Sequence, residues 1–266
     1  MKDWALVTGA CSGIGLELAR GLAERGHPLV VVSNRAQALG EAAESLRTAH
    51  GVEVHAVTMD LARPEAAAAL YAEVKARGVE VGVLINNAGM LLFGEVALAE
   101  PAKLEAMLVL HTVTPTLLAR HFGADMRARR RGHILIVSSI SAWRPFPSIA
   151  VYGASKRYLL DFADALRAEL CVWGVNVTCL APGATATGLY DSRVDVALAK
   201  RTRVMVEPAF VARRGLEGLF ARRARVVPGL GAKLMAWGMA LTPGWLVGLI
   251  RRRSGLLPVP GREENQ

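Results

Sequence analysis

The chain has few cysteines, and none of them falls in a paired or metal-binding pattern. Cys11, Cys171 and Cys179 are the only three in 266 residues. An odd number of widely spaced cysteines argues against a disulfide framework and against a cysteine-ligated metal, and it is typical of a reducing compartment. The N-terminal residues lead directly into a β-rich run, which leaves no room for a signal peptide. We therefore expect a cytoplasmic protein without a metal site.

The sequence also lacks the features of a nucleic-acid-binding protein. Its formal net charge is +9 at pH 7, but the arginines form short clusters near expected helix ends, where cations complement the helix dipole. No aromatic residues are interleaved with them, and no nucleic-acid-binding motif is present. We expect no specific binding of nucleic acid.

No stretch is long and apolar enough to cross a membrane. A single transmembrane helix needs about 20 uninterrupted apolar residues, and the apolar tail over residues 232–253 is interrupted by Thr242, Pro243 and Gly244. This pattern predicts two short helices that either cap a pocket or rest on a membrane surface.

What the chain does contain is a regular alternation of short apolar runs with Ala- and Leu-rich helical segments. The apolar runs, such as PLVVVS and HILIVSS, do not alternate with polar residues, as is typical of parallel strands covered on both faces. Strands that alternate with helices imply right-handed crossovers. We expect a single α/β domain with a doubly wound Rossmann fold. Residues 1–190 would form its core, and residues 191–266 a substrate loop and a helical C-terminal cap.

A glycine-rich turn follows the first expected strand. Residues 8–15 read TGACSGIG, and a helical pattern begins at once. Glycines allow a tight turn and a close approach to a pyrophosphate, and the helix N-terminus offers unpaired N–H groups to phosphates. Such a turn alone is weak evidence. Its place between the first strand and the first helix of an α/β chain favours dinucleotide binding.

Tyr152 and Lys156 lie four residues apart at the start of a long helical pattern. Positions i and i+4 lie on one face of a helix, so the phenol and the ammonium can meet. In isolation such a pair is more often a surface tyrosine packed over a lysine stem. The meaning of the pair therefore depends on the rest of the chain.

Four motifs, taken in order, resemble those of the short-chain dehydrogenase/reductase family. They are TGxxxGIG at residues 8–15, NNAG at 86–89, Ser139 with YxxxK at 152–156, and PGxxxT at 182–187. The resemblance covers residues 2–189 and is looser in the tail. It implies a nicotinamide-dependent oxidoreductase that acts on an alcohol or a carbonyl. The alternative is a catalytically weak or inactive dinucleotide-binding protein of the same fold, such as a sensor or scaffold.

The resemblance implies catalytic roles for the matching residues. Tyr152 would give or take the proton, Lys156 would lower the pKa of the phenol and hold the nicotinamide ribose, and Ser139 would hydrogen-bond the substrate oxygen. Ser138 and Ser141 are alternatives by proximity. The cofactor would also contact other matching positions. Those positions are Gly9, Ser12, Gly13, Ile14, Gly15, Asp60, Leu61, Asn87, Ala88, Gly89, Pro182, Gly183, Thr185 and Thr187.

The chain departs from the family pattern at His111. The family usually has an asparagine in the helix before the serine strand, where it helps to organise a water relay to the lysine. The local pattern places His111 there, with Thr112 as the nearest rival. A neutral imidazole that bonds to water near Lys156 would preserve the relay. With an ordinary pKa near 6.5, it would add an acidic limb to the rate profile between about pH 5.5 and 7.

The end of the second strand, Ser33-Asn34-Arg35, has no carboxylate for a ribose diol. NAD-selective sites usually place an acid there, whereas an arginine accommodates a 2′-phosphate. Against this, Ser12 stands where many NADP-dependent enzymes carry a basic residue, and Arg35 has the alternative role of a solvated helix-start residue. We predict NADP(H) rather than NAD(H).

The helices expected over residues 101–131 and 152–171 carry more apolar residues than one buried face requires. In the family these helices form a bundle shared between subunits, so the resemblance implies a homodimer or homotetramer. The expected substrate is a small-molecule carbonyl or alcohol of apolar character.

Overall fold

The computed structural model describes residues 2–144, 146–186 and 205–242. Its centre is a parallel sheet with the strand order β3-β2-β1-β4-β5-β6-β7. The order reverses between β1 and β4, and ligands of doubly wound sheets bind in the crevice outside the carboxyl ends at such a point. The strands are β1 (Trp4–Thr8), β2 (Leu29–Ser33), β3 (Val54–Thr58), β4 (Val81–Asn86), β5 (Gly132–Val137), β6 (Val175–Leu180) and β7 (Arg225–Val226).

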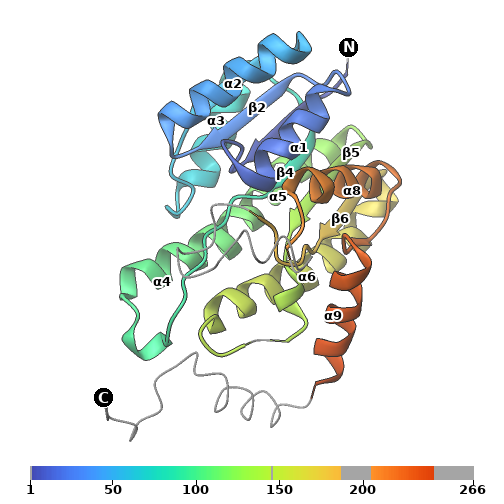
Figure 1. Cartoon of the computed structure of the whole chain (residues 1–266). Coiled ribbons are helices and arrows are strands. Elements are labelled where there is room, and N and C mark those ends of the chain that lie inside the picture. Colours follow the sequence, from blue (N-terminus) through green and yellow to red (C-terminus); the bar gives the residue numbers. More distant parts are fainter. Residues whose placement is uncertain (1, 145, 187–204, 243–266) are drawn as a thin grey trace, which may run out of the picture.

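Helices cover both faces of this sheet. One apolar core joins the strands to α1 (Gly13–Ala23), α2 (Ala36–His50) and α8 (Pro208–Phe220). The other joins them to α3 (Ala66–Ala76), α5 (Thr114–Ala128) and α6 (Ala150–Leu170). Every residue of β2, β4 and β6 is buried, because side chains on both faces meet a helix. The expected single-domain, doubly wound Rossmann fold is confirmed (Figure 1).

The helix expected from residue 101 has an irregular turn in its middle. It runs as α4 (Pro101–Leu108), a π-helical turn η2 (Val109–Val113) and then α5. Pro115 has no N–H to donate to the carbonyl of His111 four residues earlier, and the N–H of Thr114 reaches back five residues to Val109. The side chain of Asn86 fixes this break, since its Nδ2 donates to the Pro115 carbonyl at 3.1 Å. Such π turns occur frequently at functional sites.

The described residues after the expected boundary at residue 190 pack against the layers of the same domain. Helix α8 packs against α1, and an added Cβ at Gly21 would lie 2.6 Å from Leu216 Cδ1. Strand β7 pairs with β6 and extends the sheet. Both elements lie in the layers of the domain because their apolar residues complete one of its cores. The expected substrate loop falls largely on residues 187–204, outside the described residues, as does the second half of the tail.

Helix α9 (Leu230–Leu241) stands apart from these layers, at the edge of the molecule (Figure 1). It packs against the short turn η3 (Ile140–Ala142), and an added Cβ at Gly183 would lie 3.2 Å from Ala232 Cβ. The expected cap is thus present as one helix within the described residues. None of the helices in the described ranges is long and apolar enough to pass through a membrane.

Candidate active site

The glycine-rich turn closes tightly at the carboxyl end of β1. Gly9 and Gly13 adopt left-handed φ values of 66° and 55°, which glycine reaches at no steric cost. An added Cβ at Gly15 would overlap the Gly9 carbonyl oxygen. The Thr8 hydroxyl accepts hydrogen bonds from the Asn87 and Ala88 N–H groups at 2.9 and 3.0 Å. The turn is therefore joined to the end of β4 across the crevice.

This turn has the properties of a phosphate-binding cradle. Ser12 caps α1 in an extended conformation, and the first turn of α1 has no acidic side chain. The positive end of the helix dipole and its unpaired N–H groups thus face the crevice without a competing carboxylate. The predicted cofactor contacts Ile14 and Gly15 lie on this same turn of α1.

The predicted 2′-phosphate residues gather around Arg35. Its Nη2 donates to Ser12 Oγ at 2.6 Å and to Cys11 Sγ at 3.0 Å. Cys11 Sγ in turn lies 3.0 Å from Ser33 Oγ. The guanidinium is therefore held over the glycine-rich turn instead of extending freely into solvent, although Arg35 itself is exposed. The sequence had left open whether it is a solvated helix-start residue, and these contacts join its guanidinium to the glycine-rich turn.

Three predicted contacts lie at nearby strand ends. Asn34 is exposed after β2, and Leu61 is buried after β3. Asp60 Oδ1 accepts the N–H of Ala62 at 3.0 Å, which orders the loop that follows β3. The structure therefore brings these residues to the same edge of the sheet as the glycine-rich turn.

Helix α6 carries Tyr152 and Lys156 into the crevice. Lys156 is 4% exposed, and its Nζ donates to the Val137 carbonyl at 3.1 Å, at the end of β5. The Lys156 Nζ lies 5.6 Å from the centroid of the Tyr152 ring. Burial lowers the pKa of Lys156 to about 8, since a low-dielectric surrounding disfavours the charged form. The reading of this pair as a surface tyrosine over a lysine stem is wrong.

His111 lies against the same tyrosine. The ring is fully buried, and its centroid is 5.8 Å from that of Tyr152 in an edge-to-face arrangement. The Met90 N–H donates to Nε2 at 3.0 Å, and Nδ1 lies 2.8 Å from Ser155 Oγ. Nε2 is thus an acceptor, and this network assigns the proton to Nδ1. Ser155 Oγ then donates to the Tyr152 carbonyl at 2.8 Å, so His111 joins the end of β4 to the start of α6.

Two expectations about His111 are corrected by these contacts. Both ring nitrogens have protein partners, so the ring is not the direct ligand of a relay water. Burial, together with the nearby charge of Lys156, lowers the pKa of His111 well below 6.5. The ring therefore stays neutral through the range where an ordinary histidine titrates, and no acidic limb from it is expected between about pH 5.5 and 7.

The three candidate serines have different surroundings. Ser138 Oγ donates to the Lys156 carbonyl at 2.6 Å and fixes α6 to β5. Ser141 is buried, and within the described residues its hydroxyl has no hydrogen-bond partner. Ser139 is partly exposed and caps η3, with its Oγ accepting from the Ser141 N–H at 3.2 Å. Of the three, Ser139 has the hydroxyl that remains most available to a substrate.

Most of the remaining predicted contacts lie in the segment after β6, which is hydrogen-bonded to η3. The Pro182 carbonyl accepts the N–H of Ile140 at 3.0 Å, and the Thr185 hydroxyl donates to the Gly183 carbonyl at 2.9 Å. Gly89 faces the acid–base centre, where an added Cβ would lie 3.1 Å from His111 Nε2 and 3.5 Å from Lys156 Nζ. Thr187 lies outside the described residues.

Sequence reasoning missed Met90, Ser155 and Cys11. Ser155 lies inside the YxxxK motif, but its partner His111 is 44 residues away in the sequence. Met90 contributes a backbone N–H, which leaves no signature in the side-chain pattern. Cys11 had been considered only for disulfide or metal chemistry, although its place in the glycine-rich turn was a usable signal.

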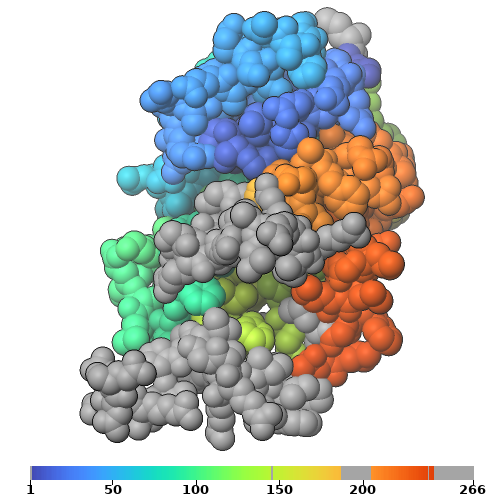
Figure 2. All heavy atoms as spheres, in the orientation of Figure 1, coloured from blue at the N-terminus to red at the C-terminus, as the bar shows by residue number. Residues whose placement is uncertain are grey.

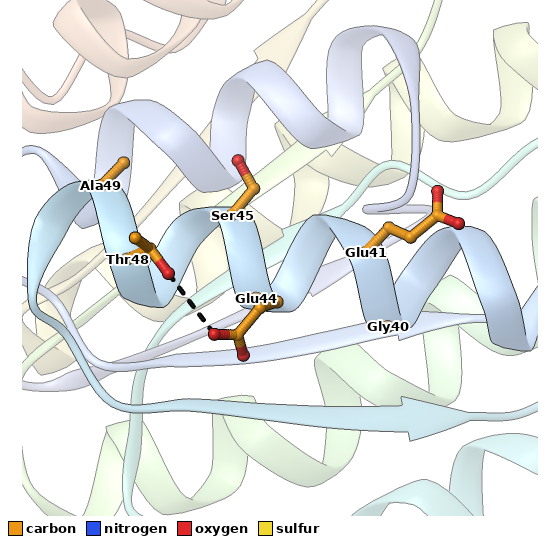
Figure 3. Close-up of a pocket in the computed structure, with 6 residues that line it drawn as sticks. All are labelled: Gly40, Glu41, Glu44, Ser45, Thr48 and Ala49. Carbon is orange, nitrogen blue, oxygen red and sulfur yellow. Dashed lines mark hydrogen bonds between the residues drawn. The ribbon is translucent and has the colours of Figure 1, made fainter.

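A second hollow lies on the outer surface of α2 (Figure 3). A single helix lines it, and one hydrogen bond, from Thr48 Oγ1 to Glu44 Oε1 at 3.4 Å, runs between its side chains. Figure 1 places α2 at the opposite end of the molecule from the start of α6. This hollow brings together no set of catalytic groups, so the crevice is the candidate site.

Comparison with known proteins agrees with this geometry. The family model of the short chain dehydrogenases matches residues 3–196. The chain belongs to this family. Short-chain dehydrogenases are oxidoreductases. The match includes the glycine-rich turn, His111, Ser139, Tyr152 and Lys156, and it ends before α8.

Among curated short-chain dehydrogenases, SDR family member 7B of Bos taurus is 35% identical over 189 residues. That match covers 69% of this chain but 58% of the bovine protein, so the chain corresponds to less than two thirds of that relative's length. The 7beta-hydroxysteroid dehydrogenase of Clostridium sardiniense is 30% identical over 185 residues, 70% of each chain. A short-chain dehydrogenase from Sphingobium yanoikuyae, solved in complex with NADPH, superposes with a TM-score of 0.80. It is 29% identical, and the superposition covers 97% of this chain and 99% of that one.

Proposed function

We propose that this chain transfers hydride between NADP(H) and a carbonyl or secondary alcohol, with Tyr152 as the acid/base. One observation carries the proposal: the buried Lys156 ammonium lies 5.6 Å from the centroid of the Tyr152 ring at the mouth of the crevice. The catalytically inactive alternative rests on the exchange of asparagine for His111. It is weakened because His111 is built into the support of the Tyr152 helix.

The residues of the crevice fit a nicotinamide dinucleotide. An added Cβ at Gly9 or Gly15 would collide with neighbouring atoms, so at these positions backbone N–H groups can approach a pyrophosphate closely. Arg35 would hold a 2′-phosphate, and Lys156 would hold the nicotinamide ribose. The bound cofactor would supply or accept the hydride. The NADPH complex of the Sphingobium yanoikuyae protein supports this assignment.

Tyr152 would protonate the substrate oxygen in reduction and deprotonate it in oxidation. A free phenol titrates near 10, which is too high for an efficient base at neutral pH. The Lys156 ammonium favours the phenolate. With its pKa lowered to about 8, Lys156 keeps most of its charge at neutral pH. Ser139 would hydrogen-bond the same substrate oxygen and polarise it.

His111 would act as a positioning residue in this scheme. Its neutral ring connects the Met90 N–H to Ser155, and Ser155 connects it to the Tyr152 carbonyl. The ring would therefore hold the first turn of α6, which carries Tyr152, against the loop after β4. It does so without adding a second positive charge beside Lys156, because its pKa is well below 6.5.

The proposed substrate is a bulky apolar ketone or the matching secondary alcohol. Phe93 and Leu98 expose large apolar side chains on the loop after β4. The N–H of Gly94 in that loop donates to the Ser148 carbonyl at 2.8 Å, just before α6. Across the site, α9 packs on Gly183 and η3. Apolar side chains thus lie on the loop that is joined to the start of α6, and the similarity to a 7beta-hydroxysteroid dehydrogenase points to the same class of substrate.

A panel of ketones and secondary alcohols, followed by the absorbance of the nicotinamide, tests this function. The expected result is turnover with NADPH, fastest for bulky apolar ketones and slow for small or charged aldehydes. Binding of NADPH without turnover of any member, in the presence of a folded protein, would favour the inactive alternative.

We also propose that the chain is a homo-oligomer. Leu108, Val113 and Tyr158 remain exposed on α4, η2 and α6, although they are large and apolar. Tyr158 and Phe162 stack with ring centroids 5.8 Å apart, and the hydroxyls of Tyr158 and Thr116 lie 2.8 Å apart. The elements that carry these side chains are neighbours, since α6 contacts both α4 and η2. Light scattering at micromolar concentration should give a dimer or tetramer, and a monomer would contradict the proposal. We propose a cytoplasmic location as well.

A further inference from the structure

Helix α9 exposes most of its large apolar side chains, and the described residue that it buries is Ala236. Leu230, Leu234, Trp237 and Leu241 are 73%, 62%, 69% and 64% exposed, whereas Ala236 is 4% exposed. Their spacing of four, three and four residues places the four exposed residues on one face of the helix. We call these four residues the α9 stripe.

The stripe faces away from the protein because the opposite face is already packed. Ala232 lies against Gly183, and α9 contacts η3. Arg144, just after η3, donates to the Thr242 carbonyl and so holds the other end of the helix. In Figure 2, α9 forms an outer edge of the molecule. A contiguous apolar surface of this kind on a soluble protein marks an interaction site.

The sequence around the stripe is basic and has no acidic residue. Between Glu217 and Glu263 there is no aspartate or glutamate. Over the same range the basic residues are Arg222, Arg223, Arg225, Lys233, Arg251, Arg252, Arg253 and Arg262. An apolar helix face in a basic region is complementary to anionic lipid, where buried apolar area and charge attraction add. A second copy of this chain packed on the stripe would bring together two helices that each carry Lys233 and no acidic residue.

We propose that the α9 stripe docks on an anionic lipid surface without crossing it. Trp237 lies at the centre of the stripe, and tryptophan is favoured at the boundary between headgroups and acyl chains. Lys233 is exposed and lies beside the stripe on the same helix, where its ammonium can reach the headgroups. The inner face of α9 packs beside Ser139, so docking places this side of the crevice next to the lipid.

Co-sedimentation with vesicles tests the proposal. One set of vesicles contains phosphatidylcholine alone, and the other contains equal parts of phosphatidylcholine and phosphatidylglycerol. The wild type should bind the anionic vesicles, bind the neutral ones weakly, and release as the salt concentration rises. The double variant Leu234→Glu with Trp237→Glu should lose at least about tenfold in partitioning, which corresponds to about 1.4 kcal/mol.

Val172→Glu is the matched control, since Val172 is 68% exposed on η4 (Cys171–Trp173), away from α9 in the sequence. It should bind vesicles as the wild type does. NADPH titration by fluorescence checks that every variant is folded, and this readout does not depend on turnover. Equal vesicle binding by the wild type and the double variant would overturn the proposal. So would an absence of vesicle binding by the wild type, or a lipid-free oligomer that the double variant dissociates, which would identify a second copy as the occupant.

Discussion

The two ends of the crevice, the proposed acid–base end and the proposed phosphate end, are built differently. At the acid–base end, Lys156 and His111 are buried, and each is hydrogen-bonded to backbone or to another buried side chain. At the phosphate end, Arg35 is exposed and rests on Ser12 and Cys11. A buried polar group is costly to leave unpaired, whereas an exposed one can be solvated by water. Substitutions should therefore have large effects at the first end and modest effects at the second.

The largest effect in this comparison is expected for Lys156→Met. Methionine fills part of the space of the lysine stem but removes the ammonium that favours the phenolate. Turnover should fall by at least about 100-fold, within the usual range for a lost acid–base contribution. Steady-state kinetics with NADPH measures it. Lys75→Met is the control, because Lys75 is a half-exposed lysine paired with Asp125. A loss below about tenfold would show that the ammonium does not tune Tyr152.

Variants of His111 test whether the buried end depends on a hydrogen-bonding side chain at that position. Asparagine keeps one donor and one acceptor, so His111→Asn should stay within a few-fold of the wild-type kcat. Alanine leaves the Met90 N–H and Ser155 without their partner, and His111→Ala should lose about tenfold or more in kcat, or ~1.4 kcal/mol. KM for NADPH should change little. Ser155→Ala breaks the same chain of contacts. The rise in activation free energy in the double variant His111→Ala with Ser155→Ala should therefore be smaller than the sum of the rises in the two single variants.

A different outcome for His111→Ala would show that the ring has no positioning role. If His111→Ala unfolds more easily but keeps the wild-type kcat, the ring is a packing residue and does not position Tyr152. His121→Ala serves as the control. His121 lies on α5 and stacks on Tyr71 of α3, so this variant also removes a packed imidazole but leaves Met90 and Ser155 untouched.

The burial of Lys156 should also change how the free energy of unfolding depends on pH. The pKa of Lys156 is lowered from 10.5 to about 8 in the folded protein. Between these values the unfolded chain binds more protons, so the Lys156 contribution to the free energy of unfolding increases with pH from about 8 to 10.5. The slope is at most about 1.4 kcal/mol per pH unit. Urea unfolding at several pH values should show this rise in the wild type and not in Lys156→Met. If the free energy of unfolding changes with pH in the same way in both proteins, the pKa of Lys156 is not lowered in the folded protein.

The smallest effects are expected at the phosphate end. Arg35→Ala should weaken NADPH binding by about fivefold to tenfold and leave NADH binding unchanged, because an exposed charge-assisted hydrogen bond is partly replaced by water. Cys11→Ala should weaken NADPH binding less, since it removes only one support of the guanidinium. Fluorescence titration measures both, with Arg157→Ala, an exposed and ion-paired arginine on α6, as the control. Equal losses for the two cofactors would refute the 2′-phosphate assignment.

Much of the fold could be predicted from the sequence, because burial on both faces leaves a simple pattern. Continuous apolar runs such as residues 29–32 identified central parallel strands, and the glycine-rich turn indicated where the sheet would open. The helical layers followed from the same alternation. Strand β7 could not be predicted, since a two-residue strand is too short to leave a periodic signal.

The candidate site was predictable where it depends on local spacing. Tyr152 and Lys156 share a helix face, and Gly9 to Gly15 form one turn, so both could be recognised from adjacent residues. The surroundings of His111 could not, because its partners Met90 and Ser155 come from other elements. The pKa of His111 depends on burial, which single residues do not reveal. The outward stripe of α9 was likewise hidden, since periodicity shows that a helix has an apolar face but not which way it points.

The role of Tyr152 is tested by single-turnover reduction of a bulky ketone by wild type and Tyr152→Phe, with NADPH affinity measured in parallel. Phenylalanine removes only the hydroxyl. In Tyr152→Phe the NADPH affinity should stay within about twofold of the wild-type value, while the rate of reduction should fall by at least about 100-fold. A rate within about tenfold of wild type, a barrier change of only ~1.4 kcal/mol, would contradict Tyr152 as the acid/base.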